Sequence, residues 1–278
     1  MLQLETKRQR LLGQIRGYGS CAVAFSGGVD SAVVAKAAQL ALGPAAVAVT
    51  GVSASLAGGE LDGARQLAAQ IGIRHVAIDT REFDNAAYTR NGPDRCYHCK
   101  DELYLHMEQL AERLQVAVLL NGANLDDQGD YRPGVEAAEE HHVHSPLAEC
   151  GLNKADVRQL ARDWDLTVWD KPASPCLASR VAYGEEVTPQ RLAMVDRAEH
   201  YLRQLGLATV RVRYHQGDLA RLEIPPDAIE QVCRESTRLD LIQALRGFGF
   251  KFVTLDMEGF RSGSLNQLIP SDTLRMRS

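Results

Sequence analysis

Short apolar runs alternate with longer helical patterns through the first half of this chain, and this alternation restricts the fold more than any other feature. The apolar runs fall at residues 20–25, 45–50, 75–79 and 116–121. Three helical patterns separate them: the first starts near residue 31, and the other two cover residues 60–71 and 100–114. Continuous apolar strands joined by helices are typical of a parallel sheet that is covered on both faces. We therefore predict a doubly wound α/β domain, in which ligands bind at the carboxyl ends of the strands.

The chain from about residue 185 onward follows a different pattern. Thr188 and Pro189 are typical of the N-cap and first turn of a helix. After this helix we expect two strands at residues 210–214 and 219–224, a second helix at 227–245 and a last strand at 250–255. This order predicts a second, smaller α+β domain. We place the boundary so that residues 1–184 form the first domain and residues 185–278 the second, which we expect to serve substrate binding and oligomerisation.

Composition and charge exclude several classes of protein. The 278 residues carry a formal charge of −5, with 45% hydrophobic and 24% charged residues, which excludes a disordered or fibrous chain. The acidic balance argues against a protein that holds nucleic acid through bulk charge. The first twenty residues lack a secretory signal pattern, and Gly43 and Pro44 interrupt the uncharged stretch at 37–59. We expect a cytoplasmic protein with no nucleic acid and no membrane as a partner.

The segment at residues 26–31 is the strongest chemical signal, because it joins the first predicted strand to its helix. Two glycines let the backbone approach an anion, the helix N-terminus offers unpaired N–H groups, and two serines add hydroxyl donors. The pattern is neither a Walker loop nor a GxGxxG loop. A plain glycine-rich turn with a capping serine is the alternative to a pyrophosphate cradle formed by Ser26, Gly27, Gly28, Val29, Asp30 and Ser31.

These six residues resemble the SGGxDS signature of the PP-loop ATP pyrophosphatase superfamily. The resemblance implies a PP-loop (HUP-like) fold, cleavage of ATP to AMP and pyrophosphate, and adenylation of a carboxyl or carbonyl oxygen. The segment after the fourth predicted strand resembles the second conserved loop of the superfamily, with Gly122, Asn124 and Asp127 as binding positions. Asp30 and Asp127 carry the hard oxygen ligands that Mg²⁺ prefers, and capping of a helix end is the alternative role for each.

Three further segments resemble the LarE family within that superfamily. They lie at residues 94–100, 175–180 and 210–214, and the second reads PCLASR. The resemblance runs from the first strand nearly to the carboxyl terminus. It implies an ATP-dependent sulfur transferase whose substrate is a small molecule, pyridinium-3,5-biscarboxylic acid mononucleotide, and whose product is the bisthiocarboxylic analogue. This product leads to the nickel-pincer nucleotide cofactor of lactate racemase and related enzymes.

Replacement of a carboxylate oxygen by sulfur explains why such a chain needs both an ATP loop and a thiol. A carboxylate must first be activated, and its transfer to AMP supplies a good leaving group. Cys176 is the candidate nucleophile, and the charges of Lys171 and Arg180, nearby in sequence, would stabilise its thiolate if they faced it. We assign catalysis to Cys176, Asp30 and Arg180, and we count Ser179 among the binding residues.

Cys96 and Cys99 form a C-x-x-C pair in a segment that we expect to be a polar loop. Such a pair alone fits a zinc hook, a redox pair or part of an iron–sulfur site. The LarE resemblance implies that a chain with three cysteines holds a [4Fe-4S] cluster on Cys96, Cys99 and Cys176, from which sulfide is delivered. The alternative keeps Cys176 as a sacrificial donor that ends as dehydroalanine, with Cys96 and Cys99 as bystanders or as a zinc pair with His98. Cys21 and Cys233 are expected to be small core residues.

Arg211 and Arg213 alternate with apolar residues, so both guanidinium groups are expected to leave one face of a strand. Two parallel arginines suit a phosphate, and we assign the pair to the phosphate of the mononucleotide, with a solvated strand face as the alternative. Glu199 orients an arginine, contacts a metal or is an ordinary surface carboxylate. The histidines that we expect to be solvated rather than metal-binding are His141, His142 and His144.

Two rival functions share the ATP loop. A tRNA-thiolating PP-loop enzyme would need a basic surface or an added RNA-binding module, and the charge of −5 argues against it. A nucleotide-binding regulator without catalysis would not need both an intact loop at Ser26 and an intact loop at Cys176. The expected partners are the small mononucleotide, further copies of the chain in a homo-oligomer, and a supply of sulfide or another sulfur donor.

Overall fold

A computed structural model describes residues 2–129, 133–172 and 174–261. The chain forms two compact units that interleave along the sequence. Unit 1 comprises Met1–Ser53, Gly58–Glu82 and Cys96–Ser174, and unit 2 comprises Ala54–Ala57, Phe83–Arg95 and Pro175–Ser278. The domain boundary expected between residues 184 and 185 stays a prediction.

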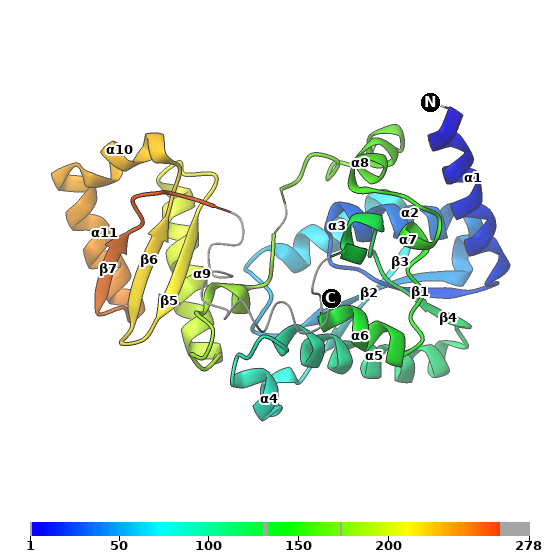
Figure 1. The fold of residues 1–278 in the computed structure, drawn as a ribbon, viewed down its shortest axis with the longest axis horizontal. Coiled ribbons are helices and arrows are strands. Elements are labelled where there is room, and N and C mark those ends of the chain that lie inside the picture. The colour runs from blue at the N-terminus through cyan, green and yellow to red at the C-terminus, as the bar shows by residue number, and fades with distance from the viewer. Residues whose placement is uncertain (1, 130–132, 173, 262–278) are drawn as a thin grey trace. The chain divides into compact units, whose positions relative to one another are not determined.

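Unit 1 is a parallel sheet with helices on both faces (Figure 1). Its elements are α1 (Leu2–Gly17), β1 (Cys21–Ala24), α2 (Val29–Leu42), β2 (Ala46–Val52), α3 (Glu60–Ile71), β3 (Arg74–Asp79), α5 (Arg95–Leu114), β4 (Val118–Leu120), α6 (Pro133–Glu140), α7 (Pro146–Glu149) and α8 (Lys154–Asp163). The predicted strands and helices are present, with ends that differ by a few residues. The largest difference is α5, which begins five residues before its predicted start.

The strand order in unit 1 is β3-β2-β1-β4, and each neighbouring pair is parallel. The chain therefore builds outward from β1 to β3 and then returns to add β4 on the other side of β1. The predicted doubly wound parallel sheet is confirmed. Its switch point lies between β1 and β4, and loops that follow these two strands meet at the edge where ligands bind in such sheets.

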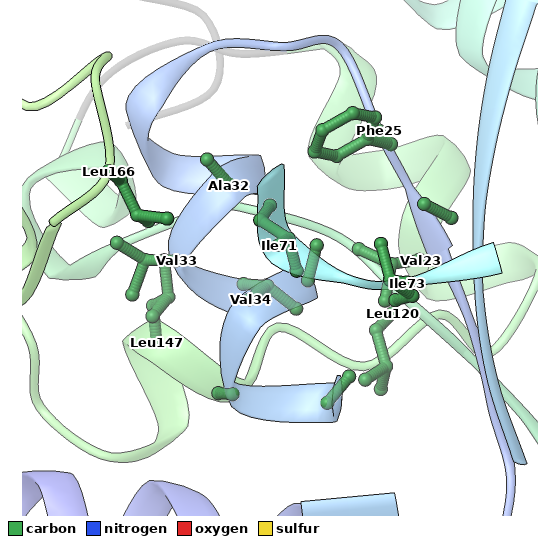
Figure 2. Packing of buried hydrophobic residues seen from close by; sticks show 14 of the residues in the cluster. Val23, Phe25, Ala32, Val33, Val34, Ile71, Ile73, Leu120, Leu147 and Leu166 are labelled. Carbon is green, nitrogen blue, oxygen red and sulfur yellow. The ribbon is translucent and has the colours of Figure 1, made fainter. Parts of the chain in front are cut away.

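The core of unit 1 is split by the sheet into two clusters. Successive residues of a strand face opposite sides, so Val23 packs in one cluster while Ala22 and Ala24 pack in the other. Helices α2, α3 and α8 cover the Val23 side, part of which is seen in Figure 2, and α5 and α6 cover the opposite side (Figure 1). Each buried Val or Leu contributes about 1.5–3 kcal/mol, so this packing fixes β1 and α2, and with them the loop between.

Unit 2 contains, in its described part, the three-stranded sheet β5-β6-β7, in which β5 and β6 are antiparallel and β6 and β7 parallel. Its elements are α4 (Ala86–Thr89), α9 (Pro189–Gln204), β5 (Arg211–His215), β6 (Leu219–Glu223), α10 (Ile229–Cys233), α11 (Glu235–Phe248) and β7 (Phe252–Leu255). The expected cap of α9 is confirmed, because the Thr188 hydroxyl accepts a hydrogen bond from the Arg191 N–H.

The structure corrects two details of unit 2. The helix expected over residues 227–245 is interrupted at Arg234, whose extended backbone (ψ 138°) separates α10 from α11. Cys233, at the end of α10, is exposed, so its assignment to the core was wrong, whereas Cys21 in β1 is fully buried as expected. Burial raises the pKa of Cys21 to about 12. None of the described helices is long and apolar enough to cross a membrane.

Candidate active site

The loop between β1 and α2, the candidate anion cradle, is compact. Gly27 adopts a left-handed conformation (φ 71°) that disfavours a side chain, and a Cβ added there would lie 3.5 Å from Ala64 of α3. The Ser31 hydroxyl donates to the carbonyl of Gly28 at 3.0 Å and accepts from the Ser26 N–H at 3.2 Å. These bonds fold the loop over the first turn of α2, so the N-terminal N–H groups of a 14-residue helix meet the glycine backbone.

The loop after β4 lies directly against this cradle. A side chain on Gly122 would come within 2.8 Å of the Ser31 nitrogen, so the two backbones are in contact. The Asn124 amide donates to Asp30 Oδ1 at 3.2 Å, and Asp127 Oδ2 accepts from the Asn124 N–H at 3.0 Å. The structure thus brings together two loops that lie about 90 residues apart in the sequence, at the switch point of the sheet.

Lys154, the first residue of α8, was missed in the sequence. Its Nζ lies 2.5 Å from Asp30 Oδ2, and its backbone N–H donates to Asp126 at 2.9 Å. A capping box between Asn153 and Asp156 fixes this end of α8. The cradle therefore contains a lysine cation and a carboxylate side by side, both partly exposed. The cap pattern was the one sequence signal that could have drawn attention to this position.

Cys96 and Cys99 are the second and fifth residues of α5 and do not lie in a polar loop, so that expectation was wrong. A spacing of three residues puts both side chains on one side of the helix. Cys96 is exposed and Cys99 is partly buried. The tyrosine between them, Tyr97, donates to Glu140 on α6, and this hydrogen bond raises the pKa of Tyr97 to about 12.

Cys176 lies in unit 2, exposed, just before the short helical turn Leu177–Arg180. Its carbonyl oxygen accepts from the Ser179 hydroxyl at 2.7 Å and from Arg180 Nη1 at 3.0 Å. Arg180 also donates to the carbonyl of Pro175. Arg180 therefore binds the main-chain carbonyls of Pro175 and Cys176. The other charge considered for the thiolate, Lys171, pairs with Glu60 of α3 at 2.8 Å.

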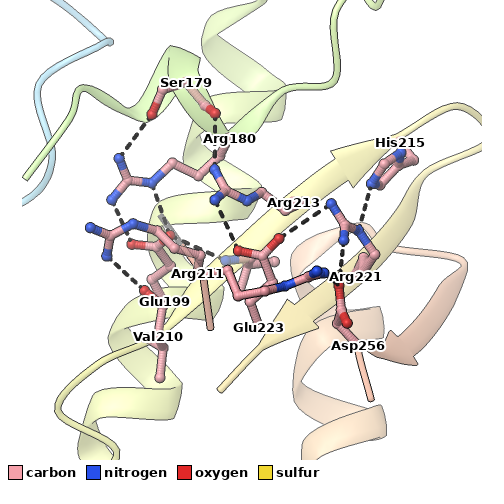
Figure 3. Close-up of polar contacts among 12 residues, drawn as sticks. Ser179, Arg180, Glu199, Val210, Arg211, Arg213, His215, Arg221, Glu223 and Asp256 are labelled. Carbon is pink, nitrogen blue, oxygen red and sulfur yellow. Dashed lines mark hydrogen bonds and ion pairs between the residues drawn. The ribbon is translucent and has the colours of Figure 1, made fainter. Parts of the chain in front are cut away.

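Glu199 is fully buried and not a surface carboxylate. Its Oε1 accepts from Arg180 Nε at 3.0 Å and from the Val212 N–H at 3.2 Å, while Oε2 accepts from Arg180 Nη2 at 3.2 Å and from Arg203 at 2.8 Å (Figure 3). A bidentate, charge-assisted pair of this kind is geometrically specific. Glu199 thus orients an arginine, which was one of the three roles considered for it.

Arg211 and Arg213 have different environments. Arg213 is buried and donates to Glu223 at 2.9 Å and to the carbonyl of Ser179 at 3.1 Å (Figure 3). Arg211 is partly buried, and this burial together with the nearby charge of Arg180 lowers the pKa of Arg211 to about 10. The buried Glu223, which was also missed in the sequence, accepts from Arg221 as well, at 3.2 Å.

These side chains form what we call the arginine cluster. Its members are Arg180, Arg203, Arg211, Arg213 and Arg221 with the carboxylates of Glu199, Glu223 and Asp256. The cluster contains more arginines than carboxylates, so it has an excess of positive charge beside the Cys176 loop. Partly dehydrated arginines with such an excess are suited to an anionic ligand.

The three candidate cluster cysteines do not all belong to the same unit. Cys96 and Cys99 belong to unit 1 and Cys176 to unit 2. Within the described ranges, no group of three or more His, Cys, Asp or Glu side chains is arranged to hold a metal ion. His141 is not simply solvated, because its ring nitrogens lie 2.9 Å from Asp101 and 2.9 Å from Glu108.

Comparison with known proteins agrees with this geometry. The family model described as asparagine synthase matches residues 12–123, which contain the cradle and all four strands of the parallel sheet. An uncharacterised protein of Synechocystis sp. is 47% identical over 96% of this chain and 99% of its own length. The pyridinium-3,5-bisthiocarboxylic acid mononucleotide synthase of Lactiplantibacillus plantarum is 38% identical over 97% of each chain. A tRNA-specific 2-thiouridylase of Beijerinckia indica is 31% identical over 55% of this chain and 44% of its own length.

The cradle, the sheet and the family match define a PP-loop ATP pyrophosphatase domain, a class that uses ATP and Mg²⁺. The near full-length similarity to the Lactiplantibacillus synthase narrows this class further. The chain belongs to the LarE family of ATP-dependent sulfur transferases.

Proposed function

We propose that this enzyme adenylates the carboxylates of pyridinium-3,5-biscarboxylic acid mononucleotide and replaces one oxygen of each with sulfur. The product is the bisthiocarboxylic mononucleotide from which the nickel-pincer nucleotide cofactor is made. The observation that carries the proposal is the pairing of an ATP cradle with an exposed Cys176 in a chain that is similar over 97% of its length to a synthase of that product.

Adenylation would take place at the cradle. A carboxylate oxygen of the substrate attacks the α-phosphorus of ATP, and pyrophosphate leaves. The glycine backbone and the first N–H groups of α2 would bind the phosphates of the leaving group, and Lys154 would neutralise part of their charge. The carboxylate of Asp30, which is partly exposed, fits a Mg²⁺ ligand, with Asp127 as a second. Bound Mg²⁺ would offset charge on the pyrophosphate.

Binding of the mononucleotide would use the arginine cluster. The substrate carries one phosphate and two carboxylates, and the excess of arginines over carboxylates in the cluster matches this negative charge. Arg211 is the arginine that we assign to direct phosphate contact, with Arg213 beside it. Glu199 and Glu223 would hold the neighbouring guanidinium groups in place, so that the substrate meets a fixed arrangement of donors.

Sulfur transfer would use the three cysteines. Their thiols fit an iron–sulfur site by donor chemistry, and we propose that Cys96, Cys99 and Cys176 hold a [4Fe-4S] cluster. Such a cluster, when bound, supplies a labile sulfide. In the alternative, the Cys176 thiolate attacks the acyl carbon, AMP leaves, and loss of the Cys176 α-proton breaks the Cβ–S bond. That route leaves the sulfur on the product and dehydroalanine in the protein, so each chain would act once.

The decisive experiment is an anaerobic reconstitution followed by iron and sulfide analysis, with Cys96→Ala compared with wild type. We expect wild type to bind a cluster and Cys96→Ala to lose it. Cys233→Ala is the matched control, because Cys233 is an exposed cysteine in α10 outside the proposed ligands. Wild type without bound iron after reconstitution would refute the cluster.

An assay with ATP and the biscarboxylate nucleotide tests the reaction itself. Thiolated product with an unchanged protein mass supports delivery from the cluster, whereas a protein lighter by the elements of H₂S identifies dehydroalanine at Cys176. Absence of both pyrophosphate and thiocarboxylate contradicts the proposed function. Tight tRNA binding in a gel-shift experiment at physiological salt would favour tRNA thiolation instead.

A further inference from the structure

The main chain of Phe25, which joins β1 to the ATP cradle, is bound to β2 through both of its polar groups. The ladder between β1 and β2 ends at Ala24 and Val49, and the Phe25 N–H continues it by donating to the Val49 carbonyl at 2.8 Å. The Phe25 carbonyl accepts from the Thr50 hydroxyl at 2.6 Å. These two bonds extend the pairing of the strands by one residue, up to the first residue of the cradle.

His75 of β3 fixes the direction of the Thr50 hydroxyl. Its Nε2 lies 2.8 Å from Thr50 Oγ1. A hydroxyl has one proton and a carbonyl oxygen can only accept, so the Thr50 proton lies on the bond to Phe25, and His75 must donate through Nε2. The His75 ring also packs against the Phe25 ring in a T-shaped arrangement, with centroids 5.8 Å apart. Because Thr50 is only 3% exposed, water has little access to replace either partner.

The peptide between Phe25 and Ser26 carries this order into the cradle. It is trans and planar, so the direction of the Phe25 carbonyl also fixes the direction of the Ser26 N–H. That N–H donates to the Ser31 hydroxyl at 3.2 Å, and the Ser31 hydroxyl donates to the Gly28 carbonyl at 3.0 Å. The hydrogen bonds therefore run in one direction, from His75 on β3 to Gly28 in the cradle. Bonds in such a series polarise and strengthen one another.

We propose that Thr50 is a positioning residue for ATP binding, because its hydroxyl holds the Phe25–Ser26 peptide in the orientation that builds the cradle. This inference deepens the proposed function and rests on its assignment of the cradle to ATP. A hydrogen bond of typical strength corresponds to about a fivefold change in an equilibrium constant, so its loss would lower the fraction of chains with a preformed cradle by about that factor. The apparent affinity for ATP falls in proportion to this fraction.

The test compares wild type with Thr50→Val, which removes the hydroxyl and keeps the shape, and with Thr50→Ser, which keeps a hydroxyl. Ser20→Ala is the matched control, because Ser20 lies at the other end of β1 and its hydroxyl accepts from the Ala117 N–H at 2.9 Å. Calorimetry measures the affinity and the number of sites for the Mg²⁺ complex of α,β-methylene-ATP, whose α–β bridge resists cleavage. Pyrophosphate release from ATP with the biscarboxylate nucleotide gives KM and kcat.

We expect Thr50→Val to bind the analogue about fivefold more weakly and KM for ATP to rise by the same factor. The number of sites should stay unchanged and kcat within about twofold of wild type, because saturating ATP restores the orientation of the loop. Thr50→Ser should recover most of the affinity, and Ser20→Ala should match wild type.

A purely structural role of Thr50 would lower the number of sites and kcat and leave the affinity unchanged, and that result would overturn the proposal. Equal binding by wild type and Thr50→Val, or an equal loss in Ser20→Ala, would overturn it as well. Wild type that does not bind the analogue would instead refute the proposed function, so the two failures are distinguishable.

The tautomer of His75 provides a spectroscopic readout that does not depend on stability. Burial and the nearby charge of Arg65 lower the pKa of His75, so its ring is neutral at about pH 8. With ¹⁵N-labelled histidine, the His75 signals are those that disappear in His75→Gln. We expect their nitrogen shifts to show a proton on Nε2. A neutral ring with its proton on Nδ1 would interrupt the hydrogen-bond series and contradict the proposal.

Discussion

The substitution Glu199→Gln tests how the arginine cluster is held together. Glu199 is fully buried and accepts four hydrogen bonds, two from Arg180, one from Arg203 and one from the Val212 N–H. Glutamine has nearly the same shape as glutamate but carries no negative charge. Its NH2 group is a hydrogen-bond donor and would face the N–H donors of the arginines. Arg180, which is also fully buried, is left as an uncompensated charge.

Removal of one partner of a buried ion pair costs about 3–5 kcal/mol. At 1.36 kcal/mol for each factor of ten, this corresponds to about a 10²–10⁴-fold loss of protection for amides that exchange through opening of α9 and β5. Hydrogen–deuterium exchange followed by mass spectrometry measures this loss locally, which suits a chain with two units better than a single melting temperature.

Glu230→Gln on α10 is the matched control. Glu230 also pairs with an arginine, Arg234 at 3.3 Å, but both side chains are largely exposed. An exposed pair of this kind contributes about 0–1 kcal/mol, so protection should change by less than about tenfold. If Glu199→Gln behaves like Glu230→Gln, the reasoning about the buried pair is wrong.

Two further predictions concern unit 1. Gly122→Ala would push a methyl group to within 2.8 Å of the Ser31 backbone nitrogen, so we expect a loss of about 1–3 kcal/mol in stability and weaker ATP binding, checked by denaturation and by calorimetry. For His141, burial lowers the pKa but hydrogen bonds to Asp101 and Glu108 outweigh it, and the net pKa is raised. A raised pKa stabilises the fold fully below the unfolded value of about 6.5, and this stabilisation is lost as pH rises through the folded value. The deficit of His141→Gln relative to wild type should therefore be larger at low pH than at high pH, and an equal deficit in thermal unfolding at both would contradict this interpretation.

The features that the sequence predicted are those whose signal is local. The α3 pattern, the apolar strands and the glycine loop after β1 are each contained in a few consecutive residues, and each was found where expected. Lys154 was not predicted as a site residue, because its partner Asp30 is 124 residues away and no local pattern marks the contact. Glu199 and Glu223 were hard to assign for the same reason, since their burial depends on arginines from other elements. The helical start of α5 was missed because a polar composition around Cys96 does not distinguish a loop from a first helical turn.

The interleaving of the two units constrains how the protein can be made and altered. Unit 2 draws residues from Ala54–Ala57 and Phe83–Arg95 as well as from Pro175 onward, so a growing chain cannot complete it until long after its first pieces have been synthesised. No single cut of the gene yields both units whole. An exchange of unit 2 between relatives would have to move all three segments together, and a fusion made at one junction should yield an incompletely folded hybrid.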